Sequence, residues 1–162
     1  MLPVSDILRL RTAVISEART WMHTPFHHQS RKKGSRGGVD CLGLVWGVGE
    51  NTKVMDPISD TDAAPFWRYY GRRPNPPKMR ECLSKFLVEL PKDIIPLPGD
   101  IAWMHWGNQM PIHMALIGET AGRDTLIHSV WNMGVMEHTL APEYRRRVRS
   151  YWRYPKIDEV MA

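Results

Sequence analysis

The sequence is poor in cysteine: Cys41 and Cys82 are the only two in 162 residues. Two thiols cannot supply a disulfide framework or a cysteine-rich zinc module. The chain also lacks any run of about 18 consecutive apolar residues, so we expect no transmembrane helix and no membrane insertion. Its first residues lack the basic and apolar regions of a secretory signal, so we expect synthesis in the cytoplasm.

The composition is that of an ordinary globular protein, with 43% hydrophobic and 24% charged residues. A length of 162 residues favours one domain, which we place at 1–162. The formal net charge is only +5, and arginines gather between Tyr144 and Arg149. No recognised nucleic-acid-binding module accompanies them, so we expect no specific nucleic-acid binding.

Hydrophobic spacing predicts helices first and strands later, which is the order of an α+β fold. The residues between 51 and 79 hold five prolines among several aromatics, and we interpret them as an ordered but irregular insertion. Three glycines in the apolar segment that begins at Cys41 indicate close packing against another element. The predicted helices are 5–22, one beginning at or near Cys41, and 79–90; the predicted strands are 101–106, 112–118, 125–131, 134–139 and 147–154.

Cys41 is the residue best placed for chemistry. A helix N-terminus offers unpaired N–H groups and the positive end of the helix dipole, and both favour thiolate over thiol. From this position we expect a nucleophilic cysteine with a lowered pKa that alkylating reagents label faster than Cys82. The alternative is that Cys41 is a small buried hydrophobe, which is a common environment for free cysteine.

Two histidines lie in successive predicted strands, His113 in 112–118 and His128 in 125–131. Side chains on neighbouring antiparallel strands can lie side by side. His113 could then take the thiol proton of Cys41 while His128 orients its ring. The same three residues could instead bind a catalytic zinc, but no local chelating motif supports this, so we expect no metal and no cofactor.

Four short blocks resemble the NlpC/p-sixty family of cell-wall cysteine peptidases. Asp40-Cys41-Leu42-Gly43-Leu44-Val45 is similar to the Asp-Cys-Ser-Gly-Leu-Val block of that family. Pro98-Gly99-Asp100-Ile101 is similar to its Pro-Gly-Asp-Leu turn. The segments 112–117 and 126–129 resemble its His-Val-Gly-Ile and Ile-His-Ala blocks, and all four blocks occur in the family order.

The resemblance implies a papain-like α+β fold, with Cys41 as nucleophile, His113 as base and His128 as the third, orienting residue. It implies hydrolysis of amide bonds in peptidoglycan stem peptides and places Asp40, Phe26 and Leu42 at substrate-binding positions. The sequence differs from the family pattern at two of these positions. Leu42 stands where the family has serine, and Phe26 stands where it has a tyrosine thought to assist the oxyanion.

A narrower resemblance concerns the segments around Phe26 and Cys41 and the tail that contains His138. They are similar to a subgroup of cell-wall peptidases coded among the tail genes of phages and gene transfer agents. The expected partners are therefore peptidoglycan peptides and tail proteins, and the expected location is a tail particle. Two alternatives stay open: a tail-tip assembly protein with little activity, and an acyltransferase or thioesterase using the same cysteine and histidines.

Overall fold

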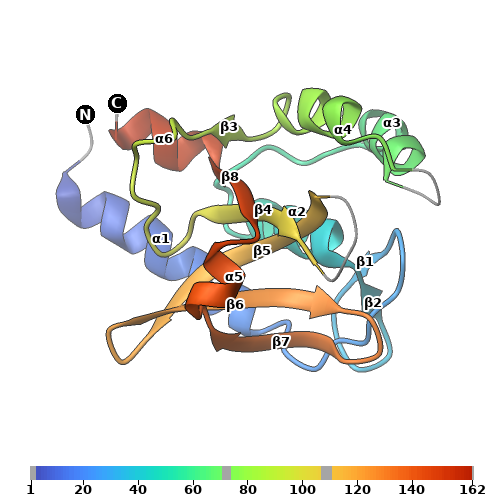
Figure 1. Ribbon diagram of the computed structural model, residues 1–162, viewed down its shortest axis with the longest axis horizontal. Coiled ribbons are helices and arrows are strands. Elements are labelled where there is room, and N and C mark those ends of the chain that lie inside the picture. Colours follow the sequence, from blue (N-terminus) through green and yellow to red (C-terminus); the bar gives the residue numbers. More distant parts are fainter. Residues whose placement is uncertain (1–2, 71–73, 107–110, 162) are drawn as a thin grey trace.

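A six-stranded antiparallel sheet runs through the middle of the molecule in the computed structural model (Figure 1), in the order β3-β8-β4-β5-β6-β7. The structure describes residues 3–70, 74–106 and 111–161. The large sheet contains β3 (Val88–Glu89), β4 (Ile101–His105), β5 (Pro111–Thr120), β6 (Arg123–Val130), β7 (Gly134–Thr139) and β8 (Val148–Arg153); β1 (Arg31–Lys32) and β2 (Gly38–Val39) form a small separate pair. The helices are α1 (Val4–Arg19), α2 (Cys41–Asn51), α3 (Asp60–Tyr69), α4 (Pro76–Leu83), α5 (Pro142–Arg145) and α6 (Pro155–Met161).

Helices cover both faces of the sheet. The larger core lies between the sheet and helices α1 and α2, where Trp46 and Trp152 are fully buried. A smaller core on the other face gathers Met104 and Leu126 under Tyr144 of α5, the helix drawn in front of the strands in Figure 1. This arrangement confirms the predicted α+β class, and each of the predicted strands is found within two residues of its expected start.

Helix α2 packs unusually close to its neighbours because of its glycines. A Cβ atom at Gly43 would lie 2.2 Å from the backbone oxygen of Ser30, and one at Gly47 would lie 2.5 Å from the ring of Trp21. Real Cβ atoms do not approach other atoms so closely, so these positions require glycine. The close packing expected from the glycines is confirmed, and it holds the loop before α2 against the start of that helix.

The segment 51–79 is more regular than predicted. It contains α3 and the start of α4, whereas the prolines indicated irregular structure. Pro76 occupies the first turn of α4, where its missing N–H costs nothing, and Pro65 is accommodated inside α3. The predicted helix 79–90 therefore begins earlier, at Pro76, and ends at Leu83, after which residues 88–89 pair with β8 as β3.

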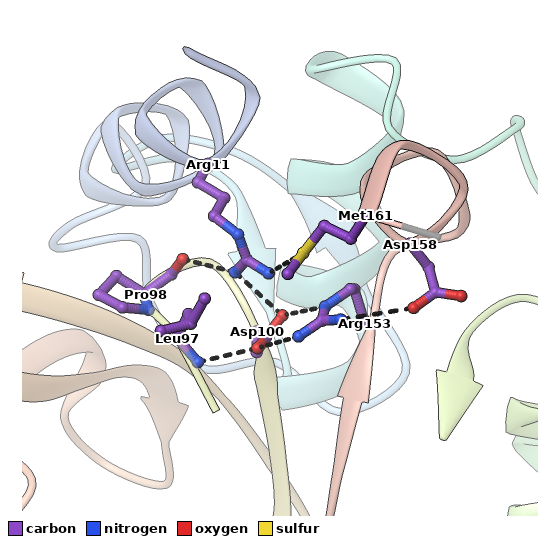
Figure 2. A network of polar contacts seen from close by, with 7 residues as sticks. All are labelled: Arg11, Leu97, Pro98, Asp100, Arg153, Asp158 and Met161. Carbon is purple, nitrogen blue, oxygen red and sulfur yellow. Dashed lines mark hydrogen bonds and ion pairs between the residues drawn. The ribbon is translucent and has the colours of Figure 1, made fainter. Parts of the chain in front are cut away.

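A buried ion network ties the turn before β4 to the two ends of the chain (Figure 2). Asp100 is fully buried and accepts hydrogen bonds from Arg153 through both carboxylate oxygens, at 2.9 and 3.0 Å. Arg11 of α1 donates to the same carboxylate at 3.0 Å and to the carbonyl oxygen of Pro98 at 2.9 Å. The carboxylate of Asp100 thus links α1 and β8 to the turn before β4.

None of the helices in the described ranges combines the length and the apolar character needed to cross a lipid bilayer.

Candidate active site

Cys41 is the first residue of α2, and Asp40 caps that helix. The backbone N–H of Gly43 donates to Oδ1 of Asp40 at 2.8 Å, and the backbone N–H of Gln29 donates to Oδ2 at 2.7 Å. The cap satisfies one of the free N–H groups of the helix terminus. It also fixes the loop at Gln29 against the start of the helix, so the position of Cys41 is set by two separate segments.

The thiol of Cys41 is buried, with 1% of the residue exposed. Its Sγ lies 3.0 Å from the hydroxyl of Tyr70, and the backbone N–H of Met114 in β5 also bonds to it. Burial above all, and next the charge of Asp40, raise the pKa of the thiol to about 12. The prediction of a lowered pKa is therefore wrong in sign, because desolvation outweighs the favourable end of the helix.

His113 and His128 lie side by side, as predicted from their successive strands. Nε2 of His113 is 2.8 Å from Nδ1 of His128, and the two ring centroids are 5.0 Å apart. His113 comes from the start of β5 and His128 from the second half of β6, and both residues are buried. A hydrogen bond of this kind fixes the orientation of the His113 ring.

A third histidine, His138 of β7, extends this pair. Its Nε2 lies 2.9 Å from Nε2 of His128, while its Nδ1 lies 3.0 Å from the carbonyl oxygen of Thr139. His138 was not predicted from the sequence to be a site residue, although a signal existed. In the predicted hairpin of 125–131 and 134–139, residue 138 lies opposite Leu126, which is two residues from His128 and on the same face.

An aromatic cover lies over the three histidines. The ring of Trp106, just after β4, is 5.1 Å from that of His113, 4.7 Å from that of His128 and 6.2 Å from that of His138. Burial is the main cause that lowers the pKa of His113 to about 3 and that of His128 to about 2. Both rings are therefore neutral near pH 7, and each has one N–H and one lone pair.

A hollow of about 180 Å³ opens beside these groups. Tyr70 and His113 both line it, so it adjoins a buried imidazole and the hydroxyl that touches the thiol. Phe26 and Trp131 form part of its aromatic rim, with ring centroids 5.5 Å apart, and Trp131 is 69% exposed. The rim of the hollow is therefore open to solvent at Trp131.

Tyr70 was missed because it lies in the segment predicted to be an irregular insertion. It follows α3, and the neighbouring Phe66 and Trp67 pack their rings 5.1 and 5.2 Å from that of Trp46 in α2. This packing carries the Tyr70 hydroxyl to Cys41. The density of aromatic residues indicated burial, but nothing in the local sequence pointed to the cysteine.

The three residues predicted to bind substrate occupy different environments. Phe26 lines the hollow and is partly exposed. Asp40 and Leu42 are buried, Leu42 lies in the main core, and both carboxylate oxygens of Asp40 are already occupied by backbone N–H groups. Phe26 therefore lies at a surface that a ligand can reach, while Asp40 and Leu42 shape the start of α2 from inside. Contact of each of the three with substrate stays a prediction.

The geometry of the histidines is that of a chain and not of a metal centre. Each of the two contacts joins a ring nitrogen of one histidine to a ring nitrogen of the next. Nitrogen atoms engaged with each other in this way do not converge on a common ion. Within residues 3–70, 74–106 and 111–161, no group of three His, Cys, Asp or Glu side chains is arranged to hold a metal.

Comparison with known proteins shows the fold. No family model matches the sequence, and the search of curated proteins found no match. Among solved structures, a protein from Staphylococcus aureus described as similar to lipoprotein, of the NLP/p-sixty family, superposes with a TM-score of 0.54 at 13% identity. The match covers 90% of this chain and 41% of that one, so the chain spans less than half the length of this structural neighbour. The chain has the NlpC/p-sixty fold.

Proposed function

We propose that the protein is a cysteine peptidase that cleaves an amide bond in peptidoglycan stem peptides. The observation that carries the proposal is the position of Cys41 at a capped helix start on this fold, together with the hydrogen-bonded pair His113–His128 on the facing strands. A nucleophile, a base and a group that orients the base are the parts that cysteine-dependent amide hydrolysis requires.

The reaction starts from a thiol and a neutral imidazole. As Sγ of Cys41 attacks the substrate carbonyl carbon, the thiol proton moves to His113, and a tetrahedral oxyanion forms. His113 then donates that proton to the leaving amine, which departs and leaves a thioester on Cys41. Water, deprotonated by His113, attacks the thioester and releases the acid and the free thiol.

Two kinds of donor are available for the oxyanion. Cys41 is the first residue of α2, and the N–H groups of a helix start can bind an anion. The Tyr70 hydroxyl, 3.0 Å from Sγ, supplies a second donor, and it comes from a different segment than Phe26, which carries no hydroxyl. We assign to Tyr70 the role of hydrogen-bonding the developing oxyanion, a role that Phe26 cannot perform.

The substrate assignment draws on the sequence resemblance and on the shared fold. The aromatic rim of Phe26 and Trp131 offers a surface for the stem peptide next to the base. The proposed setting is a phage or phage-like tail, to which the sequence resemblance of the segments near Phe26, Cys41 and His138 points. In that setting the enzyme opens the cell wall at the site where the particle attaches.

A second candidate is a tail-tip assembly protein that keeps the fold and has little activity. The buried thiol, with its pKa raised to about 12, favours this alternative. The two candidates differ in whether the thiol becomes reachable when a substrate peptide binds.

The deciding experiment compares the release of peptide fragments from purified muropeptides by the wild-type, Cys41→Ser and Cys82→Ser proteins. We expect the Cys82→Ser protein to match the wild type and the Cys41→Ser protein to lose at least about 10³-fold in rate. Equal fragment release by all three proteins would overturn the peptidase assignment. Transfer of the acyl group to an added amine, with no hydrolysis, would favour an acyltransferase.

A further inference from the structure

The carbonyl oxygen of Thr139 is the end of a chain of hydrogen bonds that begins at the base His113. A carbonyl oxygen accepts and never donates, so Nδ1 of His138 must carry a proton for their 3.0 Å contact to be a hydrogen bond. This one acceptor decides the proton positions on all three histidines, because each neutral ring has a single N–H.

The position of the proton can be assigned on each histidine ring in turn. Neutral His138 has its proton on Nδ1, so its Nε2 accepts, and Nε2 of His128 must be the donor across 2.9 Å. The Nδ1 of His128 then has a lone pair and accepts from Nε2–H of His113 across 2.8 Å. The remaining lone pair of His113 is on Nδ1, the ring nitrogen not engaged with His128.

We propose that His138 is a positioning residue that, through His128 and the carbonyl of Thr139, keeps the basic lone pair of His113 on Nδ1, the ring nitrogen left to take the Cys41 proton. The assignment of that proton to catalysis rests on the proposed function. The chain of tautomers itself rests only on the three contacts and on the acceptor character of the carbonyl.

Protonation of His138 reverses the chain. A charged His138 donates from both nitrogens, so Nε2 of His128 must accept and its proton moves to Nδ1. Nε2 of His113 then accepts, which places the His113 proton on Nδ1 and removes the basic lone pair.

His138 is the most exposed ring of the chain. His113 and His128 are buried, whereas His138 is partly exposed and lines a hollow of about 610 Å³ on the surface. The titratable and charged groups around it are His128 along the chain, Tyr144 with its ring 4.7 Å away, Arg147 beyond Tyr144, and Arg123 and Glu137, which line the same hollow.

The test uses two substitutions at the same position. His138→Gln keeps an oxygen that can accept from Nε2–H of His128, while His138→Phe keeps an aromatic ring and removes the acceptor. The primary measurement is the tautomer of each histidine by long-range proton–nitrogen correlation spectroscopy of the nitrogen-labelled, full-length protein near neutral pH.

We expect Nε2–H on His113 and His128 and Nδ1–H on His138 in the wild type. The His138→Gln protein keeps Nε2–H on His113, and the His138→Phe protein gains a population with Nδ1–H. Turnover of muropeptides should fall about tenfold or more in kcat, with KM unchanged, in the His138→Phe protein only.

Nδ1–H on His113 in the wild type, or the same His113 tautomer in all three proteins, would overturn the proposal. The spectra need no turnover, so the outcome is separate from that of the proposed function. If the Cys41→Ser protein still released fragments while the tautomers were as expected, the peptidase assignment would fail and the chain would stand. If Cys41 proved essential and the tautomers differed, only the role of His138 would fail.

Discussion

At the scale of single residues, the site is defined by a balance between burial and hydrogen bonding. The helix start favours a thiolate at Cys41, but the thiol is buried beside Asp40, and its pKa rises to about 12. The imidazole of His113 is likewise held neutral, because burial lowers its pKa to about 3. The resting protein therefore holds a thiol and a neutral imidazole instead of an ion pair.

This protonation state predicts how Cys41 reacts with iodoacetamide. In a Cys82→Ser background, which leaves Cys41 as the remaining thiol, the labelling rate should be low near pH 7. It should rise close to tenfold per pH unit up to about pH 10, since the raised pKa keeps the reactive thiolate fraction increasing over that range. A rate that is already independent of pH near neutrality would contradict the account and indicate a thiolate–imidazolium pair.

In this site the hydroxyl near the thiol comes from Tyr70, because Phe26 stands where the resembling family has a tyrosine. If Tyr70 donates to the oxyanion, Tyr70→Phe should lower kcat for muropeptide cleavage by about 10²-fold and leave KM unchanged. Tyr69→Phe, one residue away, is the matched control and should retain full activity. Faster turnover in the Tyr70→Phe protein would mean that Tyr70 acts as a cover over the thiol instead.

The helix-start position of Cys41 and the adjacency of His113 and His128 could be predicted from the sequence because they follow from local patterns. A cysteine at a helix start and histidines in two successive strands need only the element assignments and a hairpin register. Tyr70 could not be predicted in this way, because it reaches Cys41 only after α3 packs its aromatic residues on Trp46. The raised pKa of Cys41 could not be predicted from the sequence either, since burial is a property of the folded chain.

At the scale of elements, the start of α2 is the feature on which the site depends. The Asp40 carboxylate holds the backbone N–H groups of Gly43 and Gln29 in a fully buried position. Asp40→Ala should lower the free energy of unfolding by about 2–4 kcal/mol, which combines a lost cap with a buried N–H left unpaired. The measurement is urea unfolding.

Asn75→Ala is the control for that loss. Asn75 caps α4 through the backbone N–H of Lys78 at 3.1 Å, but this cap is exposed to water. Removing it should cost about 1 kcal/mol or less. Equal losses in the two variants would contradict the view that burial makes the Asp40 cap special.

The strands were easier to predict than the helices around the site. Alternating apolar residues bounded by turns located β4 to β8 well, because each is a continuous run in the sequence. Helices α3 and α4 were harder, since proline density is typical of irregular structure. Pro76 is tolerated at the first turn of a helix, and Pro65 lies within α3, whose aromatic side chains pack on Trp46 and stabilise the helix from outside.

At the scale of the whole molecule, one carboxylate links segments far apart in the chain. Asp100 pairs with Arg11 at 3.0 Å and with Arg153 at 2.9 Å, and none of the three is more than 5% exposed. Asp100→Ala leaves two buried guanidinium groups without their shared partner, so we expect a loss of about 3–5 kcal/mol in the free energy of unfolding.

The matched control for Asp100→Ala is Asp124→Ala. Asp124 pairs with Arg145 at 2.6 Å on the surface, where both side chains are about a third exposed or more. A pair of this kind contributes at most about 1 kcal/mol, so the control should unfold close to the wild-type urea concentration. A small loss in Asp100→Ala, similar to that in the control, would contradict the structural role of the network.

The central claim is that Cys41 becomes acylated during turnover. The most direct measurement is peptide mapping by mass spectrometry after rapid acid quenching of the wild-type protein mixed with muropeptides. We predict a thioester on Cys41 whose added mass equals the acyl half of the cleaved stem peptide, and a much slower appearance of that adduct in the His113→Gln protein. An adduct on Cys82, or steady fragment release with no adduct and undiminished turnover in the Cys41→Ser protein, would contradict the account.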